Sequence, residues 1–197
     1  VTIRAREENT TPKEISEKYH NIWSETFKDL DFSFDLYTKT GTENHKEVVQ
    51  KLFTLLNDKG YLEEQVSSQP YSEESEMFLS DRYIEGDCPH CPSRTKGDQC
   101  DNCGQDFEPF DLKNLISTID NSKVTFKETN HIYLKLPEFQ ENLNKWINSK
   151  SYWRPAVKNQ SLGFLSNGLI DRAITRDIDW GVEVPVKNYE KKRIYVW

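Results

Sequence analysis

The chain has 197 residues, 26 of them basic and 33 acidic, so its formal net charge at pH 7 is -7. This length suits one or two soluble domains, and the acidic balance argues against a basic clamp around nucleic acid. No apolar run approaches the ~18 residues of a membrane span and no signal-peptide pattern opens the chain, so we expect no membrane partner.

Three helices are predicted in the first 60 residues. Residues 1–9 have the character of a helix end, and Thr11-Pro-Lys-Glu14 combines an N-cap, Pro at N1 and Glu at N3, a capping box that begins a second helix. Its apolar residues recur at i, i+4 and i+7, which predicts a buried face with Trp23 and Phe27 in the core. In the third helix apolar residues run from Val48 to Leu56, and Gly60 is placed to end it.

Between the second and third helices, Phe32-Ser-Phe-Asp-Leu36 alternates with period two, which predicts a half-buried strand. His45 falls in the first turn of the third helix, where a solvated face is the expected environment. From Tyr61 the pattern changes to short strand-like pieces separated by polar turns, which predicts a small sheet. The pieces are residues 61–66, 77–79, 82–84, 124–128 and 131–136, with a helical turn within 109–119.

All four cysteines of the chain lie within this small sheet, in two C-x2-C pairs separated by eight residues. They are Cys88, Cys91, Cys100 and Cys103. Two such pairs can hold one tetrahedral Zn²⁺ through four thiolates, with no open position for water, so the zinc is expected to be structural. Gly97 and Gly104 stand where positive φ angles would turn N–H groups toward the sulfurs. His90 is expected to face solvent and not to bind the metal.

Other uses of the cysteines fit the spacing less well. Two disulfides or four unrelated thiols remain alternatives, and a redox-active C-x-x-C site lacks room for its strand and helix. Residues 69–85 contain few large apolar side chains, so zinc should supply part of the folding free energy of this region. Residues 81–111 contain eight acidic and three basic side chains, so this region should bind phosphate groups poorly. Reduced thiols on zinc also suggest a cytoplasmic protein.

The last third of the chain returns to helical spacing at residues 139–147 and 162–170. The segment from Ile174 to Gly181 is polar, charged and aromatic, typical of a functional loop. The alternative is a surface loop in which Arg176 pairs with Asp177 or Asp179. Residues 187–193 are predicted as a basic hairpin tip or linker, and 194–197 as a strand of a parallel sheet. Because that strand stops at Trp197, we expect the chain to be an internal piece of a longer protein.

Motifs spread over the whole chain carry a resemblance to a known family. They are Thr11-Pro-Lys-Glu14 with Lys18-Tyr-His20, Phe78-Leu-Ser-Asp-Arg-Tyr83, Gly86-Asp-Cys-Pro-His-Cys91, Gly97-Asp-Gln-Cys-Asp-Asn-Cys-Gly104, Lys127-Glu-Thr-Asn-His131, Thr175-Arg-Asp-Ile-Asp-Trp-Gly181 and Tyr195-Val-Trp197. In order and spacing they resemble methionyl-tRNA synthetases, which are class I aminoacyl-tRNA synthetases.

The resemblance implies an α/β fold in which a zinc-knuckle, β-rich connective domain interrupts a Rossmann-type parallel-sheet catalytic domain. Residues 1–66 would end the first half of the nucleotide-binding domain. Residues 67–136 would form the connective domain, and 137–197 the helical return and the start of the second half. Some members carry a second metal knuckle before Phe78, but Pro-Tyr-Ser-Glu-Glu-Ser-Glu-Met77 has no cysteine, so one zinc is implied.

The parent enzyme, by this resemblance, joins methionine to ATP with Mg²⁺ and passes it to its tRNA. Trp197 stands where the family has a ring that walls the methionine pocket. Arg176 stands at the arginine of the family's Ser/Thr-Arg-Asp motif, near the active site, where a fixed cation can hold a carboxylate or phosphate oxygen. The His-Ile-Gly-His and Lys-Met-Ser-Lys-Ser signatures are absent from this chain. The piece alone should therefore bind zinc and catalyse nothing.

Two other functions fit the residues without the resemblance. A closed four-cysteine site on a small sheet is typical of a stand-alone zinc-ribbon interaction module. A nucleic-acid-binding ribbon is the second alternative, and the acidic balance around the cysteines weakens it.

Overall fold

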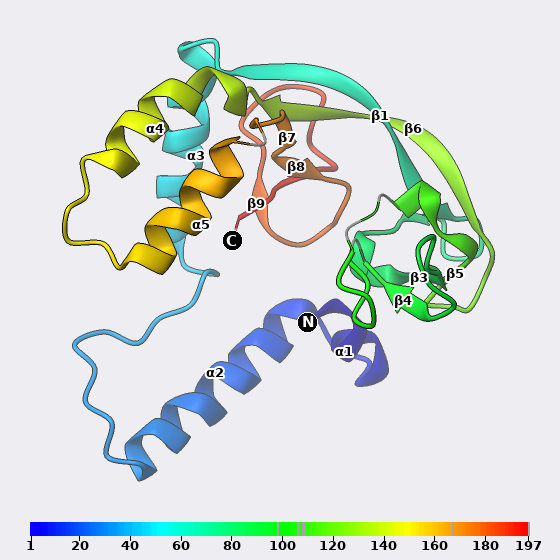
Figure 1. The fold of residues 1–197 in the computed structure, drawn as a ribbon. Helices are drawn as coiled ribbons and strands as arrows, with labels where there is room; N and C mark the ends of the chain where they lie inside the picture. Colours follow the sequence, from blue (N-terminus) through cyan, green and yellow to red (C-terminus); the bar gives the residue numbers. More distant parts are fainter. Residues whose placement is uncertain (98, 106, 108, 167, 197) are drawn as a thin grey trace.

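Two long antiparallel strands, far apart in the sequence, run through the centre of the molecule, and we call the pair the β1/β6 hairpin (Figure 1). The computed structural model describes residues 1–97, 99–105, 107, 109–166 and 168–196. The hairpin pairs β1 (Leu62–Ser72) with β6 (Val124–Leu134), in register from Leu62 opposite Leu134 to Ser72 opposite Val124. The helices at residues 43–58 and 140–166 lie near its first end, and a small sheet lies at its far end. This mixture of helices and strands confirms the predicted α/β class.

The three N-terminal helices form as predicted: α1 (Thr2–Glu7), α2 (Pro12–Asp29) and α3 (Glu43–Asp58). The capping box at the start of α2 is complete, because Glu14 N donates to Thr11 Oγ1 at 3.2 Å and Thr11 N donates to Glu14 Oε2 at 3.0 Å. Gly60 has a φ of 75°, and the next amide bonds back to the carbonyl of Leu56 at 3.0 Å. This is the predicted left-handed end of α3.

The apolar face of α2 is not buried in the way predicted. Trp23 is 52% exposed, Phe27 is only partly buried, and the segment 32–36 is an extended loop without strand pairing. The aromatic residues of this loop pack on Phe27 instead, with ring centroids 5.2 Å away for Phe34 and 5.1 Å for Tyr37. No described strand lies beside this segment, so it cannot form a ladder. The alternating aromatic residues pack instead into a local cluster on α2.

The main sheet has the order β2-β1-β6-β7, with all pairs antiparallel. The short outer strands are β2 (Met77–Phe78) and β7 (Arg172–Ala173). Two separate strands were predicted for residues 124–136, whereas β6 is one continuous strand. The reason is that every residue from 124 to 134 pairs with a residue of β1, so the polar stretch in the middle is kept extended by the ladder.

The small sheet around the cysteines has the order β4-β3-β5, formed by β4 (Arg94–Lys96), β3 (Ile84–Asp87) and β5 (Lys113–Ser117). Two short 3-10 helices lie beside it, η1 (Asp81–Tyr83) and η2 (Pro109–Asp111). The strand β5 was not predicted. The buried core here is Leu79, Ile84, Cys88, Cys100, Phe107, Leu112 and Val124. Two of these seven residues are cysteines, so the metal-site residues are themselves part of the core. We call residues 79–119 the ribbon.

A third sheet, order β8-β10-β9, is formed by β8 (Thr175–Arg176), β10 (Arg193–Ile194) and β9 (Val182–Glu183). Of the strand predicted at 194–197 for a parallel sheet, Ile194 is paired, as part of β10, residues 195–196 are not in a strand, and Trp197 lies outside the described residues. β10 is antiparallel to both neighbours. The short connection 184–192 explains its direction relative to β9, because parallel neighbours need a crossover of a dozen or more residues. The sheet shares a core with α3 and β6 through Phe53, Ile132, Val182, Val184, Tyr189 and Ile194.

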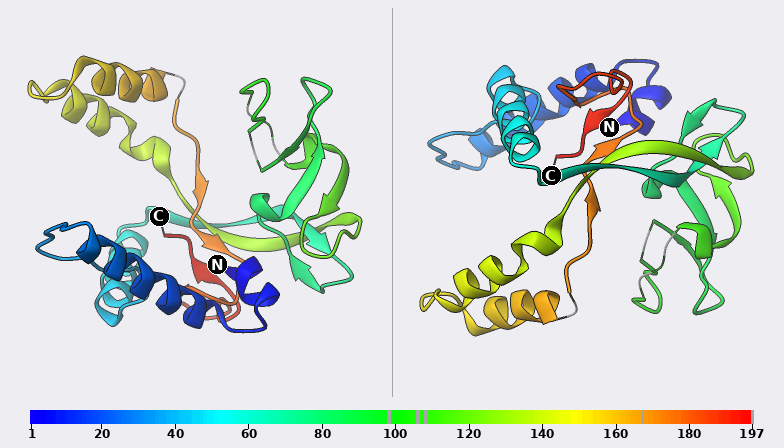
Figure 2. Two further views of the ribbon diagram at one scale, coloured as in Figure 1. Left: turned by 90° about the horizontal axis from the view of Figure 1, so that it is seen from below. Right: turned by 90° about the horizontal axis from the view of Figure 1, so that it is seen from above.

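A helical hairpin completes the fold, with η3 (Leu136–Phe139), α4 (Gln140–Asn148) and α5 (Pro155–Ser166). Both views of Figure 2 place it on the opposite side of the β1/β6 hairpin from α2 and α3. In the part of the chain that the structure describes, no helix is both long and apolar enough to span a membrane.

Candidate functional site

The four cysteines converge on one point of the ribbon, and their sulfur atoms all lie within 4.8 Å of one another. Cys88 and Cys103 are 3.9 Å apart and Cys91 and Cys100 3.7 Å apart, measured between sulfurs. A tetrahedral ion with bonds of ~2.3 Å would hold its sulfurs about 3.8 Å apart. These separations are far too long for disulfides, and the cysteines are free. The residues present therefore fit a closed four-sulfur metal site.

Local backbone geometry directs hydrogen-bond donors at these sulfurs. His90 N donates to Cys88 Sγ at 3.4 Å, and the Asn102 side chain donates to Cys91 Sγ at 3.6 Å. Gly97 and Gly104 take the predicted positive φ angles of 79° and 69°. The His90 side chain is exposed, and it is not among the four grouped ligands. The predicted turn chemistry around the cysteines is thus confirmed.

The electrostatics of the cluster favour a bound cation. Hydrogen bonds from the backbone of Ser93 and the side chain of Asn102 lower the pKa of Cys91 to about 6. At Cys103 the backbone of Gln105 favours the thiolate, but burial and the neighbouring sulfurs outweigh it and raise the pKa to about 11. The first thiolate therefore forms readily and the last resists ionisation, because like charges would crowd together. A divalent ion removes that conflict.

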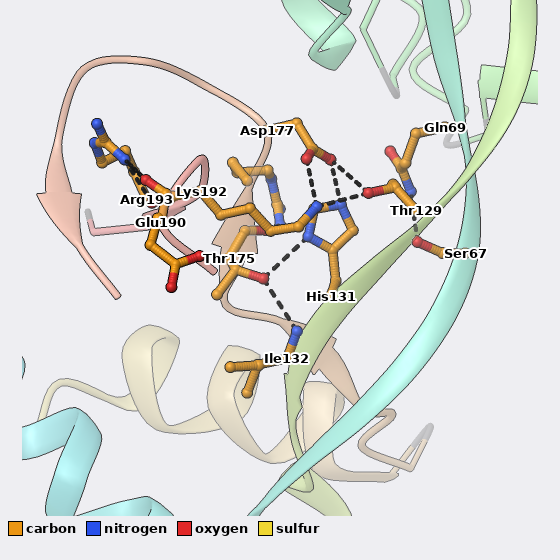
Figure 3. Close-up of polar contacts among 11 residues, drawn as sticks. Ser67, Gln69, Thr129, His131, Ile132, Thr175, Asp177, Glu190, Lys192 and Arg193 are labelled. Atoms are coloured by element: carbon orange, nitrogen blue, oxygen red, sulfur yellow. Dashed lines mark hydrogen bonds and ion pairs between the residues drawn. The ribbon is translucent and has the colours of Figure 1, made fainter. Parts of the chain in front are cut away.

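A second cluster of polar side chains fixes the chain around Arg176 (Figure 3). The segment predicted as a loop from Ile174 contains strand β8, and we call residues 173–177 the Arg176 loop. The ring of His131, on β6, is 2% exposed and touches both neighbours of that arginine. Its Nδ1 lies 3.0 Å from Thr175 Oγ1, and its Nε2 lies 3.0 Å from Asp177 Oδ2. Ile132 N also donates to Thr175 Oγ1, at 3.0 Å. The loop is thus bonded to β6 on both sides of Arg176.

Lys192, the last residue before β10, completes this cluster. Its ammonium pairs with Asp177 and donates to Thr129 Oγ1 at 2.6 Å. Burial alone would raise the pKa of Asp177, but the bonds from His131 and Lys192 outweigh it and hold that pKa below its ordinary value. Asp177 is therefore ionised at neutral pH. Lys192 is buried, which corrects the prediction that residues 187–193 form only a basic tip or linker.

Arg176 itself makes no ion pair with Asp177 or Asp179, so the pairing expected for a plain surface loop is wrong. Its Nη1 donates to the carbonyl oxygens of Ala173 and Thr175, both at 2.9 Å. Its guanidinium carbon lies 4.5 Å from the centre of the Tyr195 ring. The arginine lines a cavity of ≈ 730 Å³ between the ribbon and the third sheet, whose other basic residues are Arg82, Lys96 and Arg172. Its side chain thus lines a cavity large enough for a small molecule.

A separate cavity of ≈ 470 Å³ lies between α2, the loop before α3 and the third sheet. Trp180, Tyr195 and Val196 line it on the side of the third sheet. Trp197, predicted to wall a substrate pocket, lies outside the described residues.

Sequence reasoning did not identify His131 and Lys192 as members of a site. His131 ends one of the family motifs, Lys127-Glu-Thr-Asn-His131, and the motif by itself indicates no role for this residue. A usable signal was present, because a histidine at a position of β6 that faces the protein interior requires partners for both ring nitrogens. The identity of those partners, more than 40 residues away, could not be read from the pattern.

Comparisons with known proteins agree with one another. The family described as tRNA synthetases class I (M) matches residues 1–197. The methionine–tRNA ligase of Dehalococcoides mccartyi is 44% identical over 198 residues, which cover 100% of this chain and 36% of that protein. The methionine–tRNA ligase of Thermoplasma volcanium is 42% identical with the same coverage. The chain therefore spans about a third of the length of these relatives.

The fold is also shared with a solved structure. The crystal structure of Mycobacterium tuberculosis methionyl-tRNA synthetase bound by methionyl-adenylate has a TM-score of 0.65 and 19% sequence identity, and the match covers 97% of this chain and 33% of that chain. With the full-length family match and relatives above 40% identity, the resemblance noted in the sequence is confirmed. The chain belongs to the family of class I tRNA synthetases of the methionyl type.

Proposed function

We propose that this chain is the internal part of a methionine–tRNA ligase, an enzyme that activates methionine with ATP and Mg²⁺ and transfers it to its tRNA. The observation that carries the proposal is the family match over residues 1–197, together with relatives that are named for this activity. Residues 1–66 would belong to the first half of the nucleotide-binding domain, 67–136 to the connective domain, and 137–197 to the return into the second half. The first proposed boundary falls inside β1, so the hairpin would join the two domains.

Within that enzyme, the four-cysteine cluster would hold one structural Zn²⁺. Zinc accepts four thiolates in tetrahedral geometry, and a site with four protein ligands leaves no place for a reacting water. The fit of the sulfur separations supports this choice of metal. Four reduced cysteines also suit a reducing compartment, which supports a cytoplasmic location.

The zinc content of the purified chain tests this part of the proposal. Prepared without chelator, the protein should carry about one zinc per chain, because one four-sulfur group can be formed from its four cysteines. Plasma mass spectrometry measures the metal, and a thiol titration before and after chelation measures the cysteines that it protects. A metal content near zero or near two would contradict the prediction.

Arg176 would act on the reacting groups during adenylate formation. In that step the methionine carboxylate attacks the α-phosphate of ATP, so two anions meet and charge builds on the phosphoryl oxygens. A guanidinium that faces a cavity and is held by two backbone carbonyls can stabilise such charge without reorganising. Its fork of donors suits oxygen pairs on a carboxylate or phosphate.

Trp197 would bind the methionine side chain, which does not change during the reaction. In the full-length enzyme Trp197→Ala should therefore raise KM for methionine by about tenfold or more and change kcat little, because it removes binding that ground state and transition state share. Methionine-dependent exchange of pyrophosphate into ATP gives both constants and also tests the proposed activity.

The matched control is Trp146→Ala. That indole lies on α4, packs on Trp153 with ring centroids 5.2 Å apart and is 49% exposed. Its loss should leave KM for methionine unchanged. An unchanged KM in the Trp197 variant would show that the indole ring packs in the protein core and does not bind methionine. A full-length protein without methionine-dependent pyrophosphate exchange would refute the proposed function.

A further inference from the structure

The direction of the Arg176 side chain depends on the backbone of its own loop. The hydrogen bonds of its guanidinium within the described residues go to the carbonyl oxygens of Ala173 and Thr175, and its ring contact is with Tyr195. Among the described residues, no acidic side chain forms an ion pair with the guanidinium. Whatever fixes residues 175–177 therefore also fixes the charge of Arg176.

One side chain from outside the loop contacts both neighbours of Arg176. Thr175 and Asp177 point toward the ring of His131, as Figure 3 shows, and each bonds to a different ring nitrogen at 3.0 Å. His131 belongs to β6, more than 40 residues earlier in the chain. Because both ring nitrogens are used, the imidazole fixes the position of the loop and also its rotation.

The hydrogen bonds on the Asp177 side of this cluster have a defined direction. Asp177 is ionised and acts only as an acceptor, so Nε2–H of His131 donates to the carboxylate. On the other side, Thr175 Oγ1 accepts from Ile132 N and also lies 3.0 Å from Nδ1 of His131. On the far side, Lys192 pairs with Asp177 and holds it against Thr129. The polar side chains of His131, Thr175, Asp177, Lys192 and Thr129 thus all have partners within the cluster, and such a satisfied network favours a single geometry.

We propose that His131 is a positioning residue for Arg176, which ties the orientation of the catalytic guanidinium to the β1/β6 hairpin and so to the metal-binding ribbon at its far end. The proposal rests on the function proposed for Arg176. It goes further, because it gives the β1/β6 hairpin a part in adenylate formation. That part is played through His131, which positions Arg176 and does not itself contact the substrate. A hairpin that only joined two domains would not need a histidine whose two ring nitrogens bond to the residues before and after Arg176.

A double-mutant cycle in the full-length enzyme tests this inference. His131→Asn keeps a polar atom near the position of Nδ1 but cannot reach Asp177, whereas His131→Gln can still place an N–H near the position of Nε2. We expect His131→Asn to lower kcat for methionine-dependent pyrophosphate exchange about tenfold with KM little changed, and His131→Gln to recover part of that loss. In an Arg176→Ala background His131→Asn should have almost no further effect, because its action passes through the arginine.

The matched control is Thr125→Val, on the same strand. Its hydroxyl bonds to Tyr71 and Glu73 at the ribbon end of the hairpin and has no contact with the loop. This change should leave kcat unaltered in both backgrounds. An equal loss from His131→Asn with and without Arg176 would overturn the proposal, because His131 would then act independently of the arginine. Failure of Arg176→Ala alone to lower kcat would instead refute the role proposed for the arginine.

Hydrogen exchange gives a readout that does not depend on activity. In His131→Asn the amides of residues 173–177 should exchange at least tenfold faster, while those of β3 and β5 in the ribbon keep their protection. Equal protection of 173–177 in the variant and the parent would refute the positioning role. Loss of protection throughout the chain would also count against it, because the histidine would then be a general stabilising residue.

Discussion

Replacement of Arg176 by alanine or glutamine in the full-length enzyme should lower kcat for methionine-dependent pyrophosphate exchange by ~10²-fold or more. The reason is that charge builds on the phosphoryl oxygens only as the reaction proceeds, so a fixed cation stabilises the transition state more than it stabilises the bound substrates. KM for methionine should therefore change much less than kcat. Steady-state exchange kinetics at saturating ATP separate the two constants.

Two further variants sharpen this test. Arg176→Lys retains the charge but loses the planar fork, so it should recover only part of the rate if two oxygens are held at once. Arg172→Ala removes a second arginine that lines the same ≈ 730 Å³ cavity, and it should leave kcat unchanged. An Arg176→Ala enzyme with normal kcat would show that this arginine has no catalytic role.

The second large effect is expected at the metal site. Cys100→Ser should abolish zinc binding and unfold the ribbon, because Cys100 is 1% exposed and belongs to the same buried core as Leu79 and Ile84. Apparent binding free energies of structural zinc, about 10–16 kcal/mol, match or exceed the whole stability of a typical domain. Two of the seven buried residues of this core are cysteines of the metal site, so loss of the metal also disturbs the apolar packing.

The unfolding should remain local. The helix α3 packs through Phe53 on Ile132 and Val182, which belong to the other buried core. Zinc analysis, together with hydrogen exchange of residues 84–117 and 43–58, should show metal loss and fast exchange in the first range only. The control is His90→Ala, an exposed position between two ligands, which should keep its zinc. Full metal content and a protected ribbon in Cys100→Ser would contradict a four-cysteine site.

Features encoded by neighbouring residues could be predicted from the sequence. The capping box at Thr11 and Glu14 depends on atoms three residues apart, and the structure shows both of its bonds. The left-handed end of α3 at Gly60 is equally local. The grouping of the four cysteines was predicted from the spacing of two C-x2-C pairs, and the structure excludes the alternative of two disulfides, because the sulfurs lie 3.7 and 3.9 Å apart.

Features that depend on which segments meet could not be predicted in this way. The alternation at Phe32 and Phe34 suits a strand, but the rings pack locally on Phe27 of α2. The direction of β10 is set by the short connection that precedes it, and not by its apolar character. The partners of His131 lie in a loop that the chain reaches only after α4 and α5. Such contacts are tertiary, and no local period encodes them.

The length of the β1/β6 hairpin sets how strongly a displacement of the ribbon would affect His131. The ten residue steps from Leu134 to Val124 span roughly 33 Å, and His131 is three steps from Leu134. For a rigid arm that pivots at Leu134, a displacement at Val124 would be reduced to about three-tenths of its size at His131. The 3.0 Å bonds of His131 exceed hydrogen-bond range after a stretch of about 0.5 Å. A displacement of the ribbon below about 1.7 Å would therefore leave both bonds of His131 intact.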